Sequence, residues 1–488
     1  MQLRIDCEEE ALRSDLIPGA RIAFFGSFSH LMRATNPGCF DYEHYGYSQG
    51  ILGQVKGKLS DIRLLKSAPF YRKWLSRIRF SLKDHILSLA DEKDAGILIC
   101  ILTGDKGGLT DYWKKLYQDG GIIHLLTLSG LHVSVLGMGL YSLLMKLTGH
   151  LSLSAFLSSF LLITFLILAG GGSSMVRAVL CYLILVTGRV LGRQADNLTG
   201  VCTALLLLLM EHPLILFESG FLMMTGSLFG ITILLPMAEV IFCGEKPYDH
   251  YLKSLLTASL MQLSSLFAVL YFNGAAPLYG TFINMLTVPF MGLVFIAALL
   301  AVLVSYILPF AGLFFMGTAH VILAWYERVC LFFDGMPHAR FVGGRPYLWQ
   351  LLLGFFLLFT SFIYLYRESI WKRKRLPFFT GLVLLPLGFL FLSRFQGTDL
   401  TVYFLDVGQG DGIVMDLPGR QGILCVDGGS SSNKELTSYV YKPFLNFLGA
   451  DHVDYWFITH PDFDHYSAMA ELLSEGFVID HILIPEGF

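Results

Sequence analysis

The sequence is poor in charge, and it has neither a paired-cysteine motif nor an apolar run at its start. Of its 488 residues only 15% are charged, whereas an average soluble domain carries about 25%. None of the eight cysteines forms a C-x-x-C pair, which excludes a zinc ribbon and a thioredoxin-type redox motif. Residues 1–10 are polar and acidic, so they do not form a secretory signal peptide. The net charge of -3 is small, and any basic surface must therefore be local.

What the sequence has instead is a long succession of apolar segments between residues 122 and 393. Hydrophobic residues make up 54% of the chain, and the mean hydropathy is +0.59. About 20 apolar residues in a helix can cross the hydrocarbon core of a bilayer. We therefore predict a polytopic α-helical membrane protein of about ten spans, at 122–145, 151–169, 174–190, 198–211, 220–241, 254–272, 281–305, 309–333, 347–366 and 376–393. The 198–211 segment is short enough to be re-entrant.

The lysine and arginine residues between the spans indicate an orientation. Short loops rich in these residues stay in the cytoplasm, and the basic loops 189–193, 246–253 and 367–375 all fall on one side of the predicted spans. An even number of spans then places both polar flanks outside. Because the N-terminal flank has no signal of its own, we expect further chain before Met1. An outside location would also permit a disulfide between Cys7 and Cys39.

The N-terminal flank divides into two predicted regions. Residues 1–65 contain strand-like runs at 20–28 and 51–58 and turn-forming residues at 36–41, which predict the end of a small β-barrel. Residues 66–121 predict an amphipathic helical connector, with one helix from Phe70 to about Leu102. Its basic and aromatic residues favour a surface helix. The alternative is a basic stripe that binds phosphates or lies on a bilayer.

Five polar residues inside the apolar block are candidates for lining a passage. These are His124, Ser129, His132, Arg177 and Gln262. Polar groups at membrane depth usually face a cavity or a partner. The alternative is ordinary hydrogen bonding between helices, which stays open for His132 and Arg177 and is the preferred interpretation for Gln262.

The C-terminal flank, residues 398–488, has the pattern of an α/β domain. Strands are predicted at 400–407, 412–416, 422–426 and 453–459, and helices at 434–448 and from about Ser467. Aspartate and glycine residues follow several of these strands, including Asp411 and Asp427. Strand ends are where an α/β sheet places its functional side chains.

Directly after the last strand comes the pattern H-x-D-x-D-H, formed by His460, Asp462, Asp464 and His465. Alternate residues of an extended segment point the same way, so the first three can converge, and the second histidine can join from the first turn of a helix. Imidazole and carboxylate groups suit zinc, manganese or iron. Two such ions can activate a hydroxide for attack on a phosphodiester. The alternative is a polar turn with aspartates that cap a helix.

Several motifs together resemble the ComEC family of competence proteins. They are LDVGQGD, VDGG and THPDFDH in the C-terminal flank, LTGD at 102–105, GGIIHLLTLSGLHVSVLG at 120–137, SSMVRA at 173–178, GRQADN at 192–197 and NPGCFDY at 36–42. The resemblance implies an OB-fold region near residues 1–65, a channel for single-stranded DNA at 122–393 and a metallo-β-lactamase-like domain at 398–488.

The resemblance also implies roles and partners. His460, Asp462, Asp464 and His465 would bind a divalent metal, Mn or Zn, and Asp411, Asp427 and Asp464 would be catalytic in a nuclease. The partners would be DNA, the lipid bilayer of a bacterial cytoplasmic membrane, a DNA receptor, a cytoplasmic translocase and further copies of the chain.

The chain departs from the family pattern at both ends. Upstream spans, the first part of the OB-fold and the later metal ligands are missing, so the resemblance implies a truncated nuclease domain that is inactive as it stands. The GFLMM run at 220–224 also replaces a more polar GFQLS run and weakens a pore role for that span. A membrane-anchored metallohydrolase and a small-molecule transporter with a vestigial hydrolase domain are the alternative functions.

Overall fold

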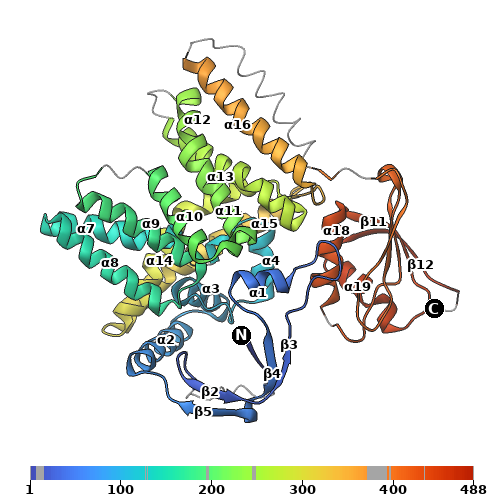
Figure 1. Ribbon diagram of the computed structural model, residues 1–488, viewed down its shortest axis with the longest axis horizontal. Coiled ribbons are helices and arrows are strands. Elements are labelled where there is room, and N and C mark those ends of the chain that lie inside the picture. The colour runs from blue at the N-terminus through green and yellow to red at the C-terminus, as the bar shows by residue number, and fades with distance from the viewer. Residues whose placement is uncertain are drawn as a thin grey trace. The chain divides into compact units, whose positions relative to one another are not determined.

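The computed structural model describes residues 2–6, 16–126, 128, 130–193, 197–243, 249–370, 393–394, 397–433 and 435–486 (Figure 1). These residues fall into two compact units. The first unit contains Met1–His30, Gly50–Leu216 and Tyr279–Ala339, and the second contains Leu31–Gln49, Phe217–Leu278 and Arg340–Phe488. The predicted block of spans is therefore divided between two units, and so is the N-terminal flank.

Two small sheets make up the start of the first unit. Strands β1 (Gln2–Asp6), β4 (Gln54–Lys58) and β3 (Ser27–Ser29) form one sheet, with β1 parallel and β3 antiparallel to β4. Strands β2 (Arg21–Phe24) and β5 (Ile62–Lys66) form an antiparallel pair, with the short turn η1 (Leu59–Asp61) before β5. The predicted strands at 20–28 and 51–58 are confirmed in place, although the first is two strands in different sheets. The OB-like identity of this region stays a prediction.

The predicted single helix from Phe70 to Leu102 is wrong. The chain forms α2 (Phe70–Leu89) and α3 (Glu92–Thr103), separated at Ala90, whose extended backbone (φ -115°, ψ 151°) ends the first helix. Helix α2 exposes large apolar side chains such as Phe70 and Phe80, as a surface helix does. Helix α3, in contrast, is buried from Asp94 to its end, so it belongs to the core. Helix α4 (Asp111–Asp119) follows.

Seven helical stretches among the described residues are long and apolar enough to cross a membrane. They correspond to the following elements: α6 (Gly130–Val133) with η2 (Ser134–Met138) and α7 (Gly139–Thr148); α8 (Leu151–Leu168); α11 (Ser219–Phe229) with η4 (Gly230–Leu234) and α12 (Leu235–Phe242); α13 (Asp249–Asn273); α14 (Gly280–Ser305); α15 (Pro309–Asp334); and α16 (Leu348–Ile370).

The other three predicted spans have different outcomes. Helix α9 (Ser173–Val190) occupies the segment 174–190 but is not one of the seven. Helix α10 (Asn197–Glu211) is too short to span, because 15 residues cover about 22 Å of a hydrocarbon core of about 30 Å; η3 (Pro213–Phe217) follows it. The segment 376–393 falls almost wholly outside the described residues. Seven of the ten predicted spans therefore coincide with helices long and apolar enough to cross a membrane, and the tenth lies almost wholly outside the part of the chain that the structure describes.

The first predicted span, 122–145, also begins later than expected. A separate turn of helix, α5 (Ile123–Leu126), comes first, and the long helix starts at Gly130. It then passes through the π-helical stretch Ser134–Met138, a feature that often marks functional positions in helices.

The core of the first unit lies where α3, α14 and α15 pack together. Its largest fully buried side chains include Leu98, Phe295 and Tyr326. Small residues allow the last two helices to approach closely. A Cβ added at Gly312 would lie only 2.4 Å from the Cβ of Ser305. Close packing of this kind is what holds helices together in lipid.

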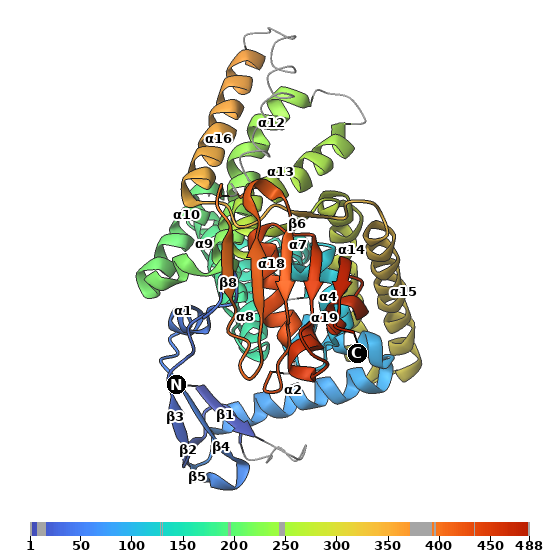
Figure 2. The same ribbon diagram turned by 90° about the vertical axis from the view of Figure 1, so that its right-hand side faces the viewer.

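The second unit contains the α/β domain, whose strands are seen side by side in Figure 2. Its sheet has the order β12-β11-β10-β9-β8. The strands are β8 (Thr401–Phe404), β9 (Ile413–Asp416), β10 (Ile423–Val426), β11 (His452–Phe457) and β12 (Val478–Leu483). Strands β10, β11 and β12 are parallel, and β8 and β9 are antiparallel to their neighbours. The four predicted strands are present, and β12 is additional.

Helices cover one face of this sheet. They are η6 (Thr437–Tyr441), α18 (Lys442–Leu448) and α19 (Phe463–Ser474), and η5 (Pro418–Arg420) joins β9 to β10. Trp456 of β11 is fully buried beneath them, whereas Tyr455 points to the other face and is 40% exposed. A second short pair, β6 (Ala275–Pro277) with β7 (Arg340–Val342), lies in the same unit. Helix α19 begins four residues earlier than predicted.

The NPGC turn of the N-terminal flank packs on the α/β domain. The amide of Cys39 donates to the carbonyl of Asn36 (3.3 Å), and Gly38 has φ +78°, as a Pro-Gly turn requires. Helix α1 (Tyr42–Ser48) follows, capped by the Asp41 side chain. Cys39 is a free cysteine whose thiol contacts the Val440 carbonyl, and burial raises its pKa to about 11. The expected partner in a disulfide, Cys7, lies outside the described residues.

Gly38→Ala is expected to destabilise the α/β domain by more than the roughly 1–2 kcal/mol that a left-handed backbone costs an L-residue. The added Cβ would lie 2.5 Å from the Phe447 Cβ and 2.7 Å from the Pro443 carbonyl oxygen. Thermal unfolding measures the loss. Gly419→Ala is the matched control, because its φ is +62° and no atom lies within 4 Å of the new Cβ. Equal losses in both variants would contradict the predicted clash.

Candidate metal site

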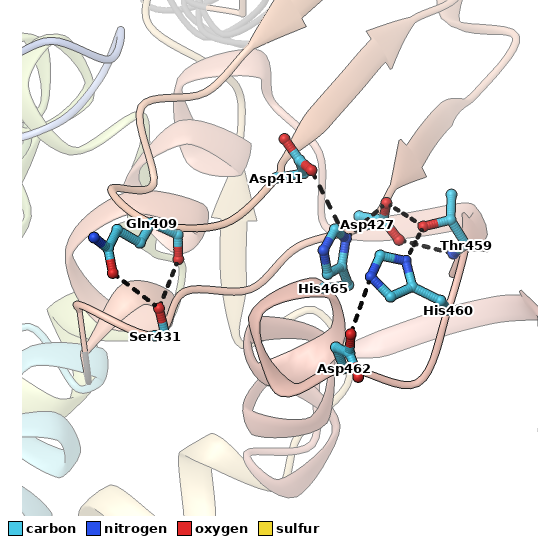
Figure 3. Close-up of polar contacts among 8 residues, drawn as sticks. All are labelled: Gln409, Asp411, Asp427, Ser431, Thr459, His460, Asp462 and His465. Carbon is cyan, nitrogen blue, oxygen red and sulfur yellow. Dashed lines mark hydrogen bonds and ion pairs between the residues drawn. The ribbon is translucent and has the colours of Figure 1, made fainter.

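The predicted metal-binding residues gather where β10 and β11 end. Parallel strands bring their carboxyl ends to one edge of a sheet. Asp427 follows β10, and Thr459 and His460 follow β11. The loop between β8 and β9 brings Asp411, and the start of α19 brings His465 (Figure 3).

Asp427 is the anchor of this group. It is 5% exposed, and its two carboxylate oxygens accept hydrogen bonds from the amide and the hydroxyl of Thr459, each at 2.8 Å. Burial raises the pKa of Asp427, but these hydrogen bonds and the nearby His465 outweigh it and lower the pKa below its ordinary value. The residue has φ +53° although it is not glycine. Such backbone strain is typical of functional sites.

His465 lies between two carboxylates. Its Nδ1 atom is 3.1 Å from Asp427 Oδ2 and 3.9 Å from Asp411 Oδ2, and the side chain is largely buried. Its main-chain carbonyl accepts from the amide of Gly428 at 2.6 Å, which fixes the start of α19 against the end of β10. Within the described part of the chain, this buried nitrogen has no well-aligned hydrogen bond. The Asp427 carboxylate at 3.1 Å is a partner of this nitrogen, and together they offer a divalent cation one nitrogen and one oxygen ligand.

His460 and Asp462 are exposed members of the group. The two imidazole rings have centroids 3.7 Å apart. His460 Nε2 is 3.4 Å from Asp462 Oδ2, and its Nδ1 is 2.9 Å from the Thr459 hydroxyl. Asp462 occupies the N-cap position of α19, yet its side chain makes no capping hydrogen bond. The alternative interpretation, an aspartate that caps the helix, is therefore not what this side chain does.

Asp464 is placed differently from the prediction. Because α19 begins at Phe463, Asp464 lies in a helical turn rather than in an extended segment, and the alternation argument does not apply to it. Its main-chain carbonyl packs closely against Gly410 and Gly429. The ion pairs found among the described residues of the group join His460, Asp462, His465, Asp411 and Asp427 and do not include the Asp464 carboxylate. The structure thus brings together His460, Asp462, His465, Asp411 and Asp427.

Thr459, Gln409 and Ser431 were not singled out from the sequence. The Ser431 amide donates to the Gln409 carbonyl at 2.8 Å, and its hydroxyl lies 3.5 Å from Gln409 Oε1. This pairing joins the loop before β9 to the loop after β10. The threonine directly before the first histidine of THPDFDH, and the glutamine of GQGD, were visible in the sequence, but their partners are set by the tertiary fold.

A tighter ligand-type group lies elsewhere on the sheet. In the described ranges, His452, Asp454 and Asp480 have ligand atoms all within 4.8 Å of one another, and two of the three are exposed. Their position at the amino end of β11 is opposite to that of the predicted site. The predicted residues do not meet this spacing, so the side chains there are more widely spread. Exposed acidic groups often lie this close together without an ion.

The candidate passage residues have different surroundings. His132 is 1% exposed with its ring 5.2 Å from that of Phe295, and Arg177 is 4% exposed. His124 is exposed on α5. In the second unit, Gln262 Nε2 donates to the Pro277 carbonyl at 3.0 Å, as the hydrogen-bonding interpretation expects. Ser129 lies outside the described residues.

Long apolar helices together with a small α/β domain define a polytopic helical membrane protein. Residues 101–368 match the model of the Competence protein family, and the chain belongs to this family. The chain is 27% identical over 487 residues to the ComE operon protein 3 of Bacillus subtilis (strain 168), covering 96% of this chain and 61% of that protein. The resemblance to the ComEC family is thereby confirmed. The apolar helices and this relative support a bacterial cytoplasmic membrane protein. No solved structure matches.

Proposed function

We propose that this protein takes up DNA in natural transformation and passes one strand across the cytoplasmic membrane. The observation that carries the proposal is family membership over the membrane helices, residues 101–368. The chain spans 61% of the length of its relative, so the activity and the partners are inferred for the whole protein. DNA, a DNA receptor, a cytoplasmic translocase and further copies of the chain are the proposed partners, with both polar flanks outside.

The α/β domain supports a second part of the proposal, a metal-dependent nuclease that degrades the other strand. Its residues fit a divalent cation, because the imidazoles of His460 and His465 lie beside each other and each lies within 4 Å of a carboxylate. His460, His465, Asp411 and Asp427 would hold Mn or Zn, with Asp462 at the edge. When bound, the metal supplies a hydroxide at neutral pH for attack on a phosphodiester.

The residues around the site prepare His460 for this role. The Thr459 hydroxyl has one proton, and the short contact to Asp427 Oδ2 (2.8 Å) uses it. The hydroxyl oxygen of Thr459 can then accept a hydrogen bond from the protonated Nδ1 atom of His460, which lies 2.9 Å away. This arrangement assigns the proton of the neutral imidazole to Nδ1 and leaves the lone pair on Nε2. Such hydrogen bonds to the other ring nitrogen orient metal-binding histidines and raise their basicity.

Labelled DNA tests the uptake function. A strain that lacks the gene should internalise no labelled strand, and expression of the chain with the rest of its gene should restore internalisation. DNA bound at the cell surface should be unchanged, because the receptor is a separate partner in the proposal. Normal internalisation in the deletion strain would refute DNA uptake and would favour the membrane-anchored hydrolase or the small-molecule transporter.

A further inference from the structure

Asn36 of the N-terminal flank is bonded to the α/β domain across 370 positions of sequence. Its Nδ2 atom donates to the main-chain carbonyl of Asp406 at 2.9 Å, and its Oδ1 atom accepts from the main-chain amide of the same residue at 2.8 Å. The side chain is 6% exposed. Both partners lie in the second unit. The buried side-chain amide of Asn36 thus bonds to both main-chain groups of Asp406, in the way that a residue of a neighbouring strand does.

The turn around Asn36 is held firmly in this position. Gly38 packs against Phe447 and Pro443 so closely that a Cβ does not fit, and Cys39 contacts the Val440 carbonyl. These contacts reach η6 and α18, whereas Asn36 reaches the loop after β8. The NPGC turn therefore joins the helical layer of the domain to the start of that loop.

The loop that Asn36 holds is the one that carries Asp411. It begins at Asp406, whose Oδ1 accepts from the Gly408 amide at 3.3 Å, and the amide of Leu405 donates to the carbonyl of Gly412 at 2.9 Å to close it. At its far end, the Asp411 carbonyl accepts from the Gly429 amide (3.3 Å) and its carboxylate approaches His465 (3.9 Å). Fixing Asp406 therefore restricts where Asp411 can lie.

We propose that Asn36 is a positioning residue of the metal site, acting through Asp406 on Asp411; the inference rests on the proposed metal-binding function. This role would make residues 31–49 a functional part of the C-terminal domain, although they precede the membrane helices in the sequence. A side chain that orients ligands without touching the metal contributes strongly to affinity. Loss of such an outer partner typically costs about 10–100-fold in metal affinity or activity.

The test compares Asn36→Ala with Ser48→Ala in the whole protein in lipid nanodiscs. Ser48 is a matched control, because it is equally buried on the same segment and its hydroxyl donates to the Tyr45 carbonyl within α1. Two readouts are used: hydrogen exchange of residues 405–412, which needs no metal, and titration with Mn²⁺ and Co²⁺. Asn36→Ala should speed exchange in that peptide, weaken Mn²⁺ binding about tenfold and alter the Co²⁺ absorption spectrum. Ser48→Ala should change none of these.

Asn36→Asp separates positioning from loss of folding. It keeps the acceptor for the Asp406 amide but sets a carboxylate oxygen against the Asp406 carbonyl, so its Mn²⁺ affinity should fall between those of the wild type and Asn36→Ala. If residues 405–412 exchange hydrogen at the wild-type rate in both Asn36 variants, the inference about Asn36 is overturned, and the proposal of a metal site is not affected. If residues 405–412 exchange faster in the Asn36 variants but the Mn²⁺ affinity and the Co²⁺ spectrum do not change, the role of Asn36 as a positioning residue is refuted and the metal site is not. A wild-type protein that binds no Mn²⁺ would refute the metal site itself.

Discussion

His465→Ala is expected to lower the affinity of the protein for Mn²⁺ by at least about 100-fold, the upper range for losing a ligand's supporting partner. His465 lies near two carboxylates, at 3.1 Å from the buried Asp427 and 3.9 Å from the exposed Asp411. Its removal would leave those two carboxylates facing each other without an imidazole between them. Titration followed by the electron paramagnetic resonance of free Mn²⁺ measures the change.

His481→Ala is the matched control for this prediction. His481 lies on β12 of the same sheet, is exposed and stacks on Tyr455 with ring centroids 4.9 Å apart. Its loss removes an imidazole from the domain but not from the candidate site. Equal Mn²⁺ affinities in the two variants would show that the cation binds elsewhere, and the group of His452, Asp454 and Asp480 would be the next place to examine.

The elements that were predicted correctly depend on local pattern. The length of an apolar run decides whether a helix can cross lipid, and seven helices long and apolar enough to do so lie where such runs were predicted. The four strands of the α/β domain have apolar cores bounded by glycine and aspartate, and they too are present. Within the site, the short spacing of His460, Asp462 and His465 limits their separation whatever the surrounding fold.

The features that were missed depend on tertiary contacts. Ala90 ends α2 inside a run that is helical by composition, and α3 then enters the core. Asp464 belongs to a helix because α19 starts one turn early, which periodicity at a strand-to-helix junction cannot resolve. The pairing of Asn36 with Asp406 joins residues 370 positions apart. No local pattern carries that information.

Arg177→Met is expected to reduce internalisation of labelled DNA to the level of a deletion strain while the protein still inserts into the membrane. Arg177 is 4% exposed near the start of α9, within the predicted span 174–190, and burying a charged side chain is costly unless it is paired. Methionine has a similar length and no charge, so it should ease insertion and keep the packing. If the proposed DNA strand passes this arginine, attraction between its charge and the phosphates gives a reason to retain it despite this cost.

Arg189→Met provides the comparison on the same helix. Arg189 lies near the end of α9, is exposed and stands over the Tyr141 ring at 5.8 Å. Removing its charge should leave internalisation close to the wild-type level. Immunoblots of isolated membranes establish that both variants are present in equal amounts. Full DNA uptake by Arg177→Met would show that this arginine serves only the packing of the helices and that the strand passes elsewhere.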